Sequence, residues 1–149
     1  MRASREVGQM ATRWSVPAGA LLSGGEPTWT GLSALLDAAS HATLTLCLAA
    51  PLGAGVDLAF AAIALGEALD EAAWLHEQVR QQPPARLGPL HIGDDLDESR
   101  HVVEQLLTTA TAHTLLMIDE AATPEEVACL GRVLRRLLTA GEEFARAAA

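Results

Sequence analysis

The sequence predicts an α/β fold, a small three-layer domain in which helices flank a sheet of mostly parallel strands. Three times along the chain a short apolar run is followed by a polar turn and then by helix-capping residues. This order of elements is typical of a doubly wound sheet. Residues 43–48 alternate with period two, which favours a strand. Four threonines within residues 108–114 lower the helix propensity before the third apolar run.

The first segment, residues 1–27, mixes Arg, Ser, Gly and Pro without periodicity. It is expected to form a flexible N-terminal arm, whose later part, residues 14–22, can dock on the rest of the chain. Residues 28–149 then form one α/β domain. Their length is sufficient for a single core.

The first helix and the first strand of this domain follow directly. Thr28 is placed to cap a short helix, which has one apolar face and ends near Ser40. The strand over residues 43–48 ends in a Pro- and Gly-containing turn at residues 51–55. Asp57 is placed to cap the next helix. That helix has an apolar stripe formed by Leu58, Ala61, Leu65, Leu69 and Ala72.

Two continuations of this second helix stay open. The helix runs unbroken to Gln82, or it stops near Asp70 and residues 72–76 form a short strand. The proline pair at residues 83–84 marks a break in both cases. Residues 87–93, which contain the run PLHIG, are predicted as a strand.

The last two helices have clear start signals. Asp95 and Glu98 form a capping-box arrangement before a helix that is expected to stop near Ala110. A strand over residues 114–118 follows. Thr123 then provides an N-cap, with proline at the first helical position, for a final helix that runs almost to the end of the chain.

The competing interpretation is an all-α four-helix bundle. Its helices would span residues 28–49, 57–82, 95–121 and 124–148. In this arrangement His76 and His113 both fall on core stripes at helical spacing. The alternation in the first predicted strand and the run of threonines decide in favour of the α/β fold.

The composition excludes several reaction classes and kinds of partner. The chain has no Lys, Asn or Tyr, which excludes a lysine Schiff base, a lysine general base, a phosphate-loop lysine and a tyrosine acid. A net charge of −9 argues against nucleic-acid binding, which needs a basic face. Cys47 and Cys129 are too few for a disulfide framework, as expected for a reduced protein of the cytoplasm.

The sequence also predicts neither a signal peptide nor contact with a membrane. Residues 10–25 are too short in apolar length and too rich in Gly for a signal-peptide core. Residues 42–66 are long and apolar, but Pro, Gly and Asp interrupt them and no Arg anchors flank them. A buried strand followed by a buried helix explains this stretch better than a membrane span.

Residues 44–57 resemble a phosphate-binding loop that has lost its chemistry. An apolar run leads into a turn in which Gly53, Gly55 and Asp57 are the candidate cofactor-binding residues. A Walker A loop ends in Lys followed by Ser or Thr, where this chain has Val56 and Asp57. A carboxylate at a helix N-terminus occupies the place that would otherwise attract a phosphate. The turn therefore predicts the framework of a phosphate loop without ATP turnover.

Acidic residues follow the other two predicted strands. In an open α/β sheet, ligands bind beyond the carboxyl ends of the strands, where the sequence has Asp94, Asp95, Asp119 and Glu120. Converging carboxylates could hold Mg²⁺ for phosphoryl chemistry, so these four residues are candidate metal ligands. The structural alternative is that Asp95 is an N-cap and that Asp119 and Glu120 are loop residues before the next cap.

The run TLLMI, which delivers Asp119 and Glu120, is similar to a Walker B strand that follows the degenerate loop. Together with the strand that ends at residues 50–51, the PLHIG strand and the long last helix, it resembles the RecA-like superfamily over roughly residues 28–140. The likeness is greatest to catalytically inactive members, the SulA-like cell-division inhibitors of the bacterial SOS response. The resemblance implies a RecA-like sheet and a function through binding of a protein partner.

The sequence therefore predicts a non-catalytic regulatory domain that acts through protein–protein contact, with a partner or as a homodimer, and without a cofactor. The candidate contact residues are aromatic and cationic side chains of the types enriched at binding hot spots: Trp14, Trp29, Arg132, Arg135 and Arg136. Two alternatives stay open. One is an Mg²⁺-dependent nucleotide-binding protein or phosphoryl-transfer enzyme that uses the acidic residues, and the other is a helical-bundle module that binds a ligand.

Overall fold

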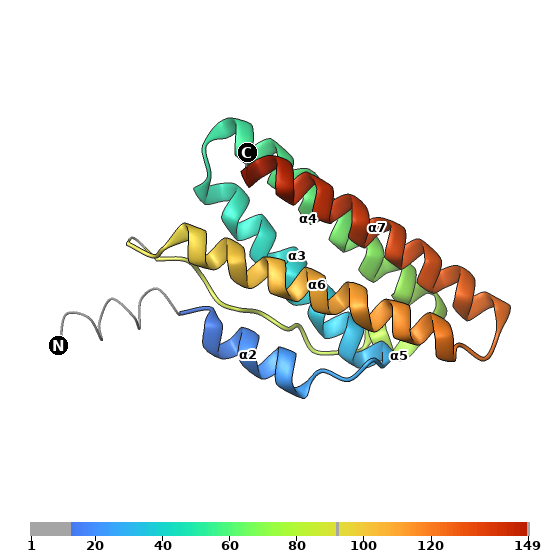
Figure 1. Cartoon of the computed structure of the whole chain (residues 1–149). Helices are drawn as coiled ribbons and strands as arrows, with labels where there is room; N and C mark the ends of the chain where they lie inside the picture. Colours follow the sequence, from blue (N-terminus) through green and yellow to red (C-terminus); the bar gives the residue numbers. More distant parts are fainter. Residues whose placement is uncertain (1–12, 92, 149) are drawn as a thin grey trace.

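The computed structural model describes residues 13–91 and 93–148, in which every regular element is an α-helix (Figure 1). The four long helices are α3 (Trp29–Ala49), α4 (Leu52–Leu75), α6 (Leu96–Glu120) and α7 (Pro124–Ala148). Two shorter helices accompany them, α2 (Ser15–Gly24) and α5 (Glu77–Arg80). The described residues thus form a bundle of four long helices with one short helix on its side and another at its end.

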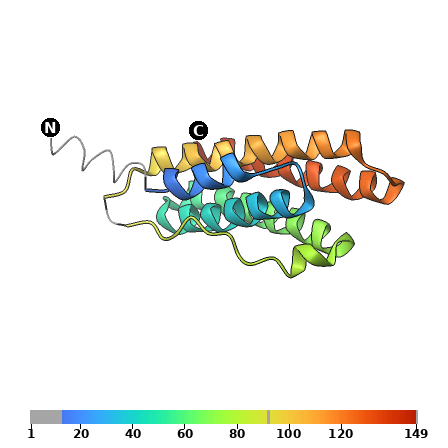
Figure 2. The same cartoon turned by 90° about the horizontal axis from the view of Figure 1, so that it is seen from below.

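Two antiparallel hairpins build the bundle, α3 with α4 and α6 with α7. α4 packs along α7 and α3 packs along α6, so that each long helix has two antiparallel neighbours. After α5, an extended connection, described over residues 81–91 and 93–95, runs back along the bundle (Figure 2). Because of this crossover, α6 starts at the same end of the bundle as α4. The topology is that of a four-helix bundle with one long crossover connection.

The helix α2 packs against α3 and α6. Trp14, immediately before α2, is 2% exposed, and its Nε1 donates a hydrogen bond to the carbonyl oxygen of Gly88 in the crossover at 3.2 Å. Arg13 Nη1 lies 3.6 Å from Asp94 Oδ1, at the far end of the crossover. The second half of the expected N-terminal arm therefore contacts the bundle, whereas its residues 1–12 lie outside the described residues.

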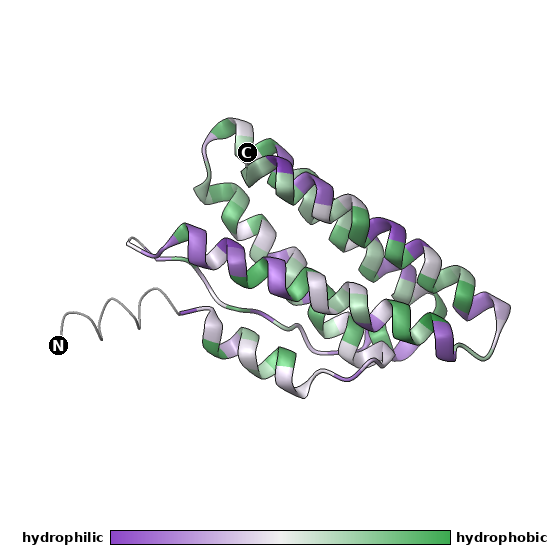
Figure 3. Cartoon of the chain, viewed as in Figure 1, coloured by the Kyte–Doolittle hydropathy of each residue, from purple (hydrophilic) through white to green (hydrophobic). Residues whose placement is uncertain are grey.

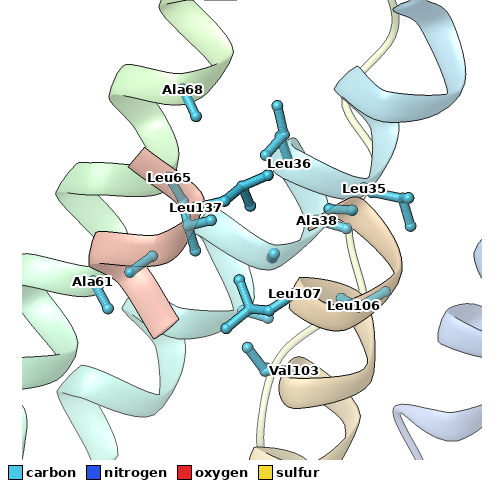
Figure 4. Packing of buried hydrophobic residues seen from close by; sticks show 14 of the residues in the cluster. Leu35, Leu36, Ala38, Ala61, Leu65, Ala68, Val103, Leu106, Leu107 and Leu137 are labelled. Carbon is cyan, nitrogen blue, oxygen red and sulfur yellow. The ribbon is translucent and has the colours of Figure 1, made fainter. Parts of the chain in front are cut away.

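The core lies between the four long helices, where their leucines meet (Figure 4). Leucines from every long helix are almost fully buried there, among them Leu36, Leu65, Leu106 and Leu137. Between them lie small side chains with no exposed surface, such as Ala38, Ala61 and Ala68. These alanines let the helix backbones approach closely while the leucines fill the remaining volume.

The predicted α/β fold with a RecA-like sheet is wrong, because residues 13–91 and 93–148 contain no strand. The segments expected as strands over residues 43–48 and 114–118 lie inside α3 and α6. The third lies in the crossover. The alternative four-helix bundle agrees with the structure.

Threonine hydroxyls show how the two misassigned segments stay helical. Thr43 Oγ1 donates a hydrogen bond to the Ala39 carbonyl oxygen at 2.6 Å, and Thr114 Oγ1 donates one to the Ala110 carbonyl oxygen at 2.7 Å. Both threonines are fully buried between helices. These bonds within the helix satisfy their hydroxyl groups, so burial of threonine here does not require a sheet.

The alternation over residues 43–48 arises from leucines on two sides of one helix. Leu46 is buried in the bundle, whereas Leu44 and Leu48 are exposed on the outer side of α3. Apolar residues on both sides of a helix weaken the 3.6-residue period by which a surface helix is identified. The pattern that predicted a strand is therefore produced by exposed leucines.

The ends of the helices follow the capping signals in part. The N-caps predicted at Thr28 and Asp95 are confirmed, since their side chains accept hydrogen bonds from backbone N–H groups of the first turn. Asp57 is not an N-cap, because α4 begins five residues earlier, at Leu52. The open question about residues 71–82 is settled by a helix to Leu75, a break at His76 and the short α5.

Candidate interaction surface

Six large apolar side chains lie exposed over residues 44–63 of the α3–α4 hairpin, outside the core. They are Leu44 and Leu48 of α3 and Leu52, Val56, Phe60 and Ile63 of α4, and we call them the hairpin face. Their exposed fractions run from 48% to 87%. A single exposed leucine is ordinary on a protein surface, but a group of large apolar side chains on two neighbouring helices marks an interaction site.

The hairpin face exists because α4 is apolar on more than one side. Leu58 and Leu65 are buried toward the core, whereas Leu52, Val56 and Ile63 recur at spacings of four and seven residues along the exposed side. In Figure 3 the tip that joins α3 to α4 is mainly green and pale, while purple residues recur along α7. The chain thus places apolar residues where a surface helix normally carries charge.

α3 and α4 are also long and apolar enough to cross a membrane, by length and composition. The most apolar window of α3 is 50% buried inside the bundle, and that of α4 is 39% buried. Core packing therefore accounts for about half of this apolar character or less. The remaining residues are half-buried or exposed, and the exposed residues of α3 and α4 include the hairpin face.

A groove of about 360 Å³ runs between α3 and α4 beside the hairpin face. Leu44 and Ile63 line it together with the small side chains of Ser40, Ala59 and Ala62. Ser40 Oγ donates a hydrogen bond to the Ala62 carbonyl oxygen at 3.3 Å and so ties the two helices together. The surface thus combines large protruding side chains with an adjoining groove lined largely by small ones.

Charge is concentrated at one end of this groove. Asp37 Oδ2 accepts hydrogen bonds from the Arg86 guanidinium and from the Ala85 N–H at 2.8 Å, and His41 lies one turn further along α3. Beyond Asp37, residues 38–66 contain one acidic side chain, Asp57, although the chain has 19 acidic residues. The hairpin face is therefore nearly uncharged in a protein with a net charge of −9.

The residues predicted as a degenerate phosphate loop lie in the first turns of α4. Gly55 is buried, and a Cβ atom added there would lie 3.2 Å from the Cys47 carbonyl oxygen of α3. Cys47 Sγ also donates to the Gly55 carbonyl oxygen at 3.1 Å. Gly55 therefore allows close approach of the two helices, while Gly53 is exposed and Asp57 is half-buried within α4. Gly53, Gly55 and Asp57 form part of a helix here and not a loop that could surround a phosphate.

The four predicted metal ligands are not brought together. Asp94 and Asp95 precede α6, whereas Asp119 and Glu120 end it, which places the two pairs about 36 Å apart along the helix. Asp95 caps the helix, and Asp94 Oδ2 accepts a hydrogen bond from the His91 N–H at 2.6 Å. Within the described ranges no group of three or more His, Cys, Asp or Glu side chains could hold a metal ion.

The predicted contact residues have separate structural settings. Trp14 is part of the core, and Trp29 is half-buried with its ring centroid 4.2 Å from that of His76. On α7, Arg132 Nε donates a hydrogen bond to Glu71 Oε2 at 2.8 Å, which raises the pKa of Arg132.

The other two arginines of this cluster differ in their contacts. Arg136 Nη1 lies 2.6 Å from Glu67 Oε2 of α4, so this guanidinium also joins α7 to α4. Arg135 is exposed on α7. Of the three predicted arginines, two therefore belong to the contact between α4 and α7.

Trp74 and the hairpin face are the exposed features that the sequence interpretation missed. Trp74 is 83% exposed near the end of α4, beside the Arg132–Glu71 and Arg136–Glu67 pairs. A helical wheel of residues 52–75 would have shown Trp74 on the same side as Val56 and Ile63. The assignment of residues 43–48 to a strand concealed the exposed leucines of α3, since it ended the first helix too early.

Cys129 joins α7 to α4 from within the bundle. Its Sγ donates a hydrogen bond to the Glu71 carbonyl oxygen at 3.2 Å. Burial raises the pKa of the Cys129 thiol, an effect that nearby Arg132 partly offsets. A buried thiol with a raised pKa is protonated and unreactive at neutral pH, which is the behaviour of a structural cysteine.

Comparisons of this chain with protein-family models, with curated proteins and with solved structures find no match. The function has to be inferred from the side chains that the bundle exposes and from those that it buries. On that basis the hairpin face and its groove form the candidate functional site.

Proposed function

We propose that this chain is a non-catalytic interaction module that binds a protein partner through the hairpin face. The observation that carries the proposal is the group of six large apolar side chains that α3 and α4 expose beside a groove. Together these side chains expose on the order of 500 Å² of apolar surface, close to the largest patch found on a typical monomeric protein. A partner that covers this surface removes it from water, which favours association.

The chemistry of the hairpin face supports a protein as the partner. Leu48 and Leu52 protrude most, with exposed fractions of 82% and 87%, and Phe60 adds an aromatic ring. An interface core is depleted in charge and enriched in large apolar side chains, with polar groups at its rim. Asp37, His41 and Arg86 at the end of the groove provide such a rim.

Site-specific photo-crosslinking in the native host tests this proposal. A photoreactive phenylalanine analogue replaces Phe60 in one variant and Leu115 in another. Leu115 is a matched control, because it is 51% exposed on α6, whereas Phe60 is 56% exposed on α4. We expect protein adducts from position 60 and none from position 115. If position 60 gave no protein adduct, or if both positions gave the same adducts, the hairpin face would not be the contact surface.

A second candidate function, binding of a small ligand by the helical bundle, is favoured by two adjoining cavities near α5. Their volumes are about 370 Å³ and 220 Å³, and both are lined by Ala34 and Gln82. Gln82 is held between them, since its Oε1 accepts a hydrogen bond from Ser33 Oγ and its Nε2 donates one to the Thr30 carbonyl oxygen, both at 3.0 Å. The two cavities therefore share a polar wall.

Thermal unfolding in the presence of small polar metabolites tests this second candidate. A ligand of these cavities should raise the melting temperature of the native chain but not that of Ala34→Trp, in which a large side chain occupies the wall that the two cavities share. Ala34 is half-buried, so the fold should tolerate the substitution. A rise of equal size in both proteins would place the ligand elsewhere.

A further inference from the structure

We infer that the hairpin face binds a second copy of this chain, so that two α3–α4 hairpins pack against each other about a two-fold axis. The inference rests on the proposed function and names its partner. Three observations carry it: the shape of the face, its charge and its area.

The shape of the hairpin face is suited to pairing with itself. A two-fold interface places the same surface on both partners, so the surface has to be complementary to itself. Leu48 and Leu52 are exposed at the tip of the hairpin and Phe60 two turns further along α4, while the groove lined by Ser40, Ala59 and Ala62 lies between α3 and α4. A two-fold rotation brings the protruding side chains of each copy over the groove of the other. The same contact is thereby made twice.

The charge distribution favours the hairpin face as the surface on which two copies meet. Each copy has a net charge of −9, so contact through charged surfaces brings like charges together. Residues 38–66 contain one acidic side chain, Asp57, and no Lys or Arg. In contrast, α6 contains five acidic side chains and one Arg. Approach through the hairpin face keeps most of the acidic residues of the two copies apart.

The face supplies more than half of the area that a dimer interface needs on each partner. Six large side chains expose on the order of 500 Å², and the small residues of the groove add to it. A stable protein–protein interface covers about 800 Å² on each partner. The charged end of the groove, with Asp37, His41 and Arg86, supplies the polar rim that completes an interface of this size.

An apolar dimer between acidic chains should tighten as salt is added. Salt screens the repulsion between two copies, whereas apolar contacts are not screened. Sulfate and phosphate salts strengthen apolar burial further. An affinity that increases with salt distinguishes the proposed dimer from one held by ion pairs, which would weaken with salt.

Analytical ultracentrifugation of the full chain tests the inference, with variants that change the sign of the introduced charge. Leu48→Glu and Leu48→Arg both place a charge on the face, and Leu115→Glu places one on α6. Leu48 is 82% exposed, so neither substitution disturbs the core. We expect the native chain to dimerise more tightly at higher salt. Both Leu48 variants should weaken the dimer by about tenfold or more, and Leu115→Glu should leave it unchanged.

Several outcomes would overturn the inference. A native chain that stays monomeric up to about 100 µM at high salt would do so, as would a dimer that Leu115→Glu weakens as much as the Leu48 variants. Dissociation by Leu48→Glu but not by Leu48→Arg would assign the effect to net charge and not to burial. Binding of the native chain to phosphatidylcholine vesicles in place of dimerisation would make the face a membrane contact.

The photo-crosslinking experiment separates failure of the dimer from failure of the proposed function. An adduct of twice the chain mass at position 60 supports the dimer. An adduct with a different protein, combined with a monomeric native chain, contradicts the dimer and retains the interaction module. The absence of any protein adduct at position 60 contradicts both.

Discussion

Alanine determines how closely the helices of this bundle approach one another. Ala38, Ala61 and Ala68 have no exposed surface and lie among the core leucines (Figure 4). Protein interiors are close-packed, so a larger side chain at such a position forces a helix to move. The distance between helices should therefore be sensitive to single substitutions of alanine.

We expect Ala68→Leu to lower the free energy of unfolding by about 1–3 kcal/mol, because the added carbon atoms overfill the core. Urea unfolding measures this change. Ala128→Leu is the matched control, since Ala128 is exposed on α7 and the same substitution there meets solvent. Equal stabilities of the two variants would mean that α4 has more space around Ala68 than the packing shows.

Cys129 should give the fold a stability that depends on pH in the alkaline range. Because burial raises the pKa of this thiol above its ordinary value of 9.0, the folded chain keeps a proton that the unfolded chain releases. The free energy of unfolding is therefore highest below pH 9 and falls as the pH rises through the pKa of the unfolded thiol and then through that of the folded one. The chain has no Lys or Tyr, whose side chains would otherwise titrate in the same pH range.

Cys129→Ala should flatten this decrease, whereas Cys47→Ala should preserve it. Urea unfolding at about pH 8 and about pH 10 gives the two free energies needed for each protein. Cys47 is the suitable control because it is the other thiol of the chain. A decrease of the same size in Cys129→Ala and in the native chain would show that another group causes it.

The tryptophans illustrate what composition cannot predict about single residues. The sequence marks Trp14 and Trp29 as contact residues because tryptophan is common at hot spots. In the structure Trp14 is buried in the core and Trp29 packs on a histidine, while Trp74 is exposed. Burial depends on which elements meet in space, and that information is not contained in the residue type.

The helix α6 has acidic residues at both ends, and the two ends should respond to mutation in opposite ways. Asp95 accepts hydrogen bonds from two backbone N–H groups of the first turn, so Asp95→Ala should lower the stability by about 1 kcal/mol. Asp119 lies at the C-terminal end, where a negative charge is unfavourable. Asp119→Asn should therefore leave the stability unchanged or raise it slightly.

Thermal unfolding with and without Mg²⁺ tests whether these carboxylates bind a metal ion. We expect Mg²⁺ to leave the melting temperatures of the native chain, Asp95→Ala and Asp119→Asn unchanged. A rise of the native melting temperature with millimolar Mg²⁺ that Asp119→Asn abolishes would contradict it. The carboxylate would then be a metal ligand, despite the distance between the two ends of α6.

The attachment of α2 should depend on one residue. Trp14→Ala removes a large buried side chain and its hydrogen bond to the Gly88 carbonyl oxygen, so we expect a loss of about 3–5 kcal/mol in the free energy of unfolding. Val16→Ala, two residues later, alters a side chain that is 77% exposed and should change little. Proteases should also cleave α2 faster in Trp14→Ala than in Val16→Ala. Equal effects of the two substitutions would show that α2 is not held by Trp14.

The sequence predicts where helices begin better than which segments are helices. Thr28 and Asp95 are recognised as N-caps because capping depends on residues within one turn. Residues 43–48 are misassigned because the helix α3 exposes leucines on its outer side, and a local pattern cannot separate a helix with an exposed apolar face from a strand. The error therefore falls on the surface proposed to bind a partner.

The order of the helices in the bundle was not predictable from local patterns. Pro83 and Pro84 predict a break between α5 and α6, but not that the connection continues along the bundle and makes α6 parallel to α4. Several arrangements of four apolar helices bury similar stripes. The arrangement that forms depends on contacts between residues far apart in the sequence, such as Trp14 with Gly88 and Asp37 with Arg86.

For the molecule as a whole, hydroxyl-radical footprinting of the native full chain tests most directly whether the hairpin face becomes covered. The oxidation rates of Leu48, Leu52 and Phe60 should fall severalfold as the concentration of the chain rises from about 1 µM to about 100 µM. The rates of Leu115, Leu116 and Leu138, which are exposed on α6 and α7, should stay constant. Equal rates at all concentrations for both sets of residues, or protection of the second set alone, would contradict a contact through the α3–α4 hairpin.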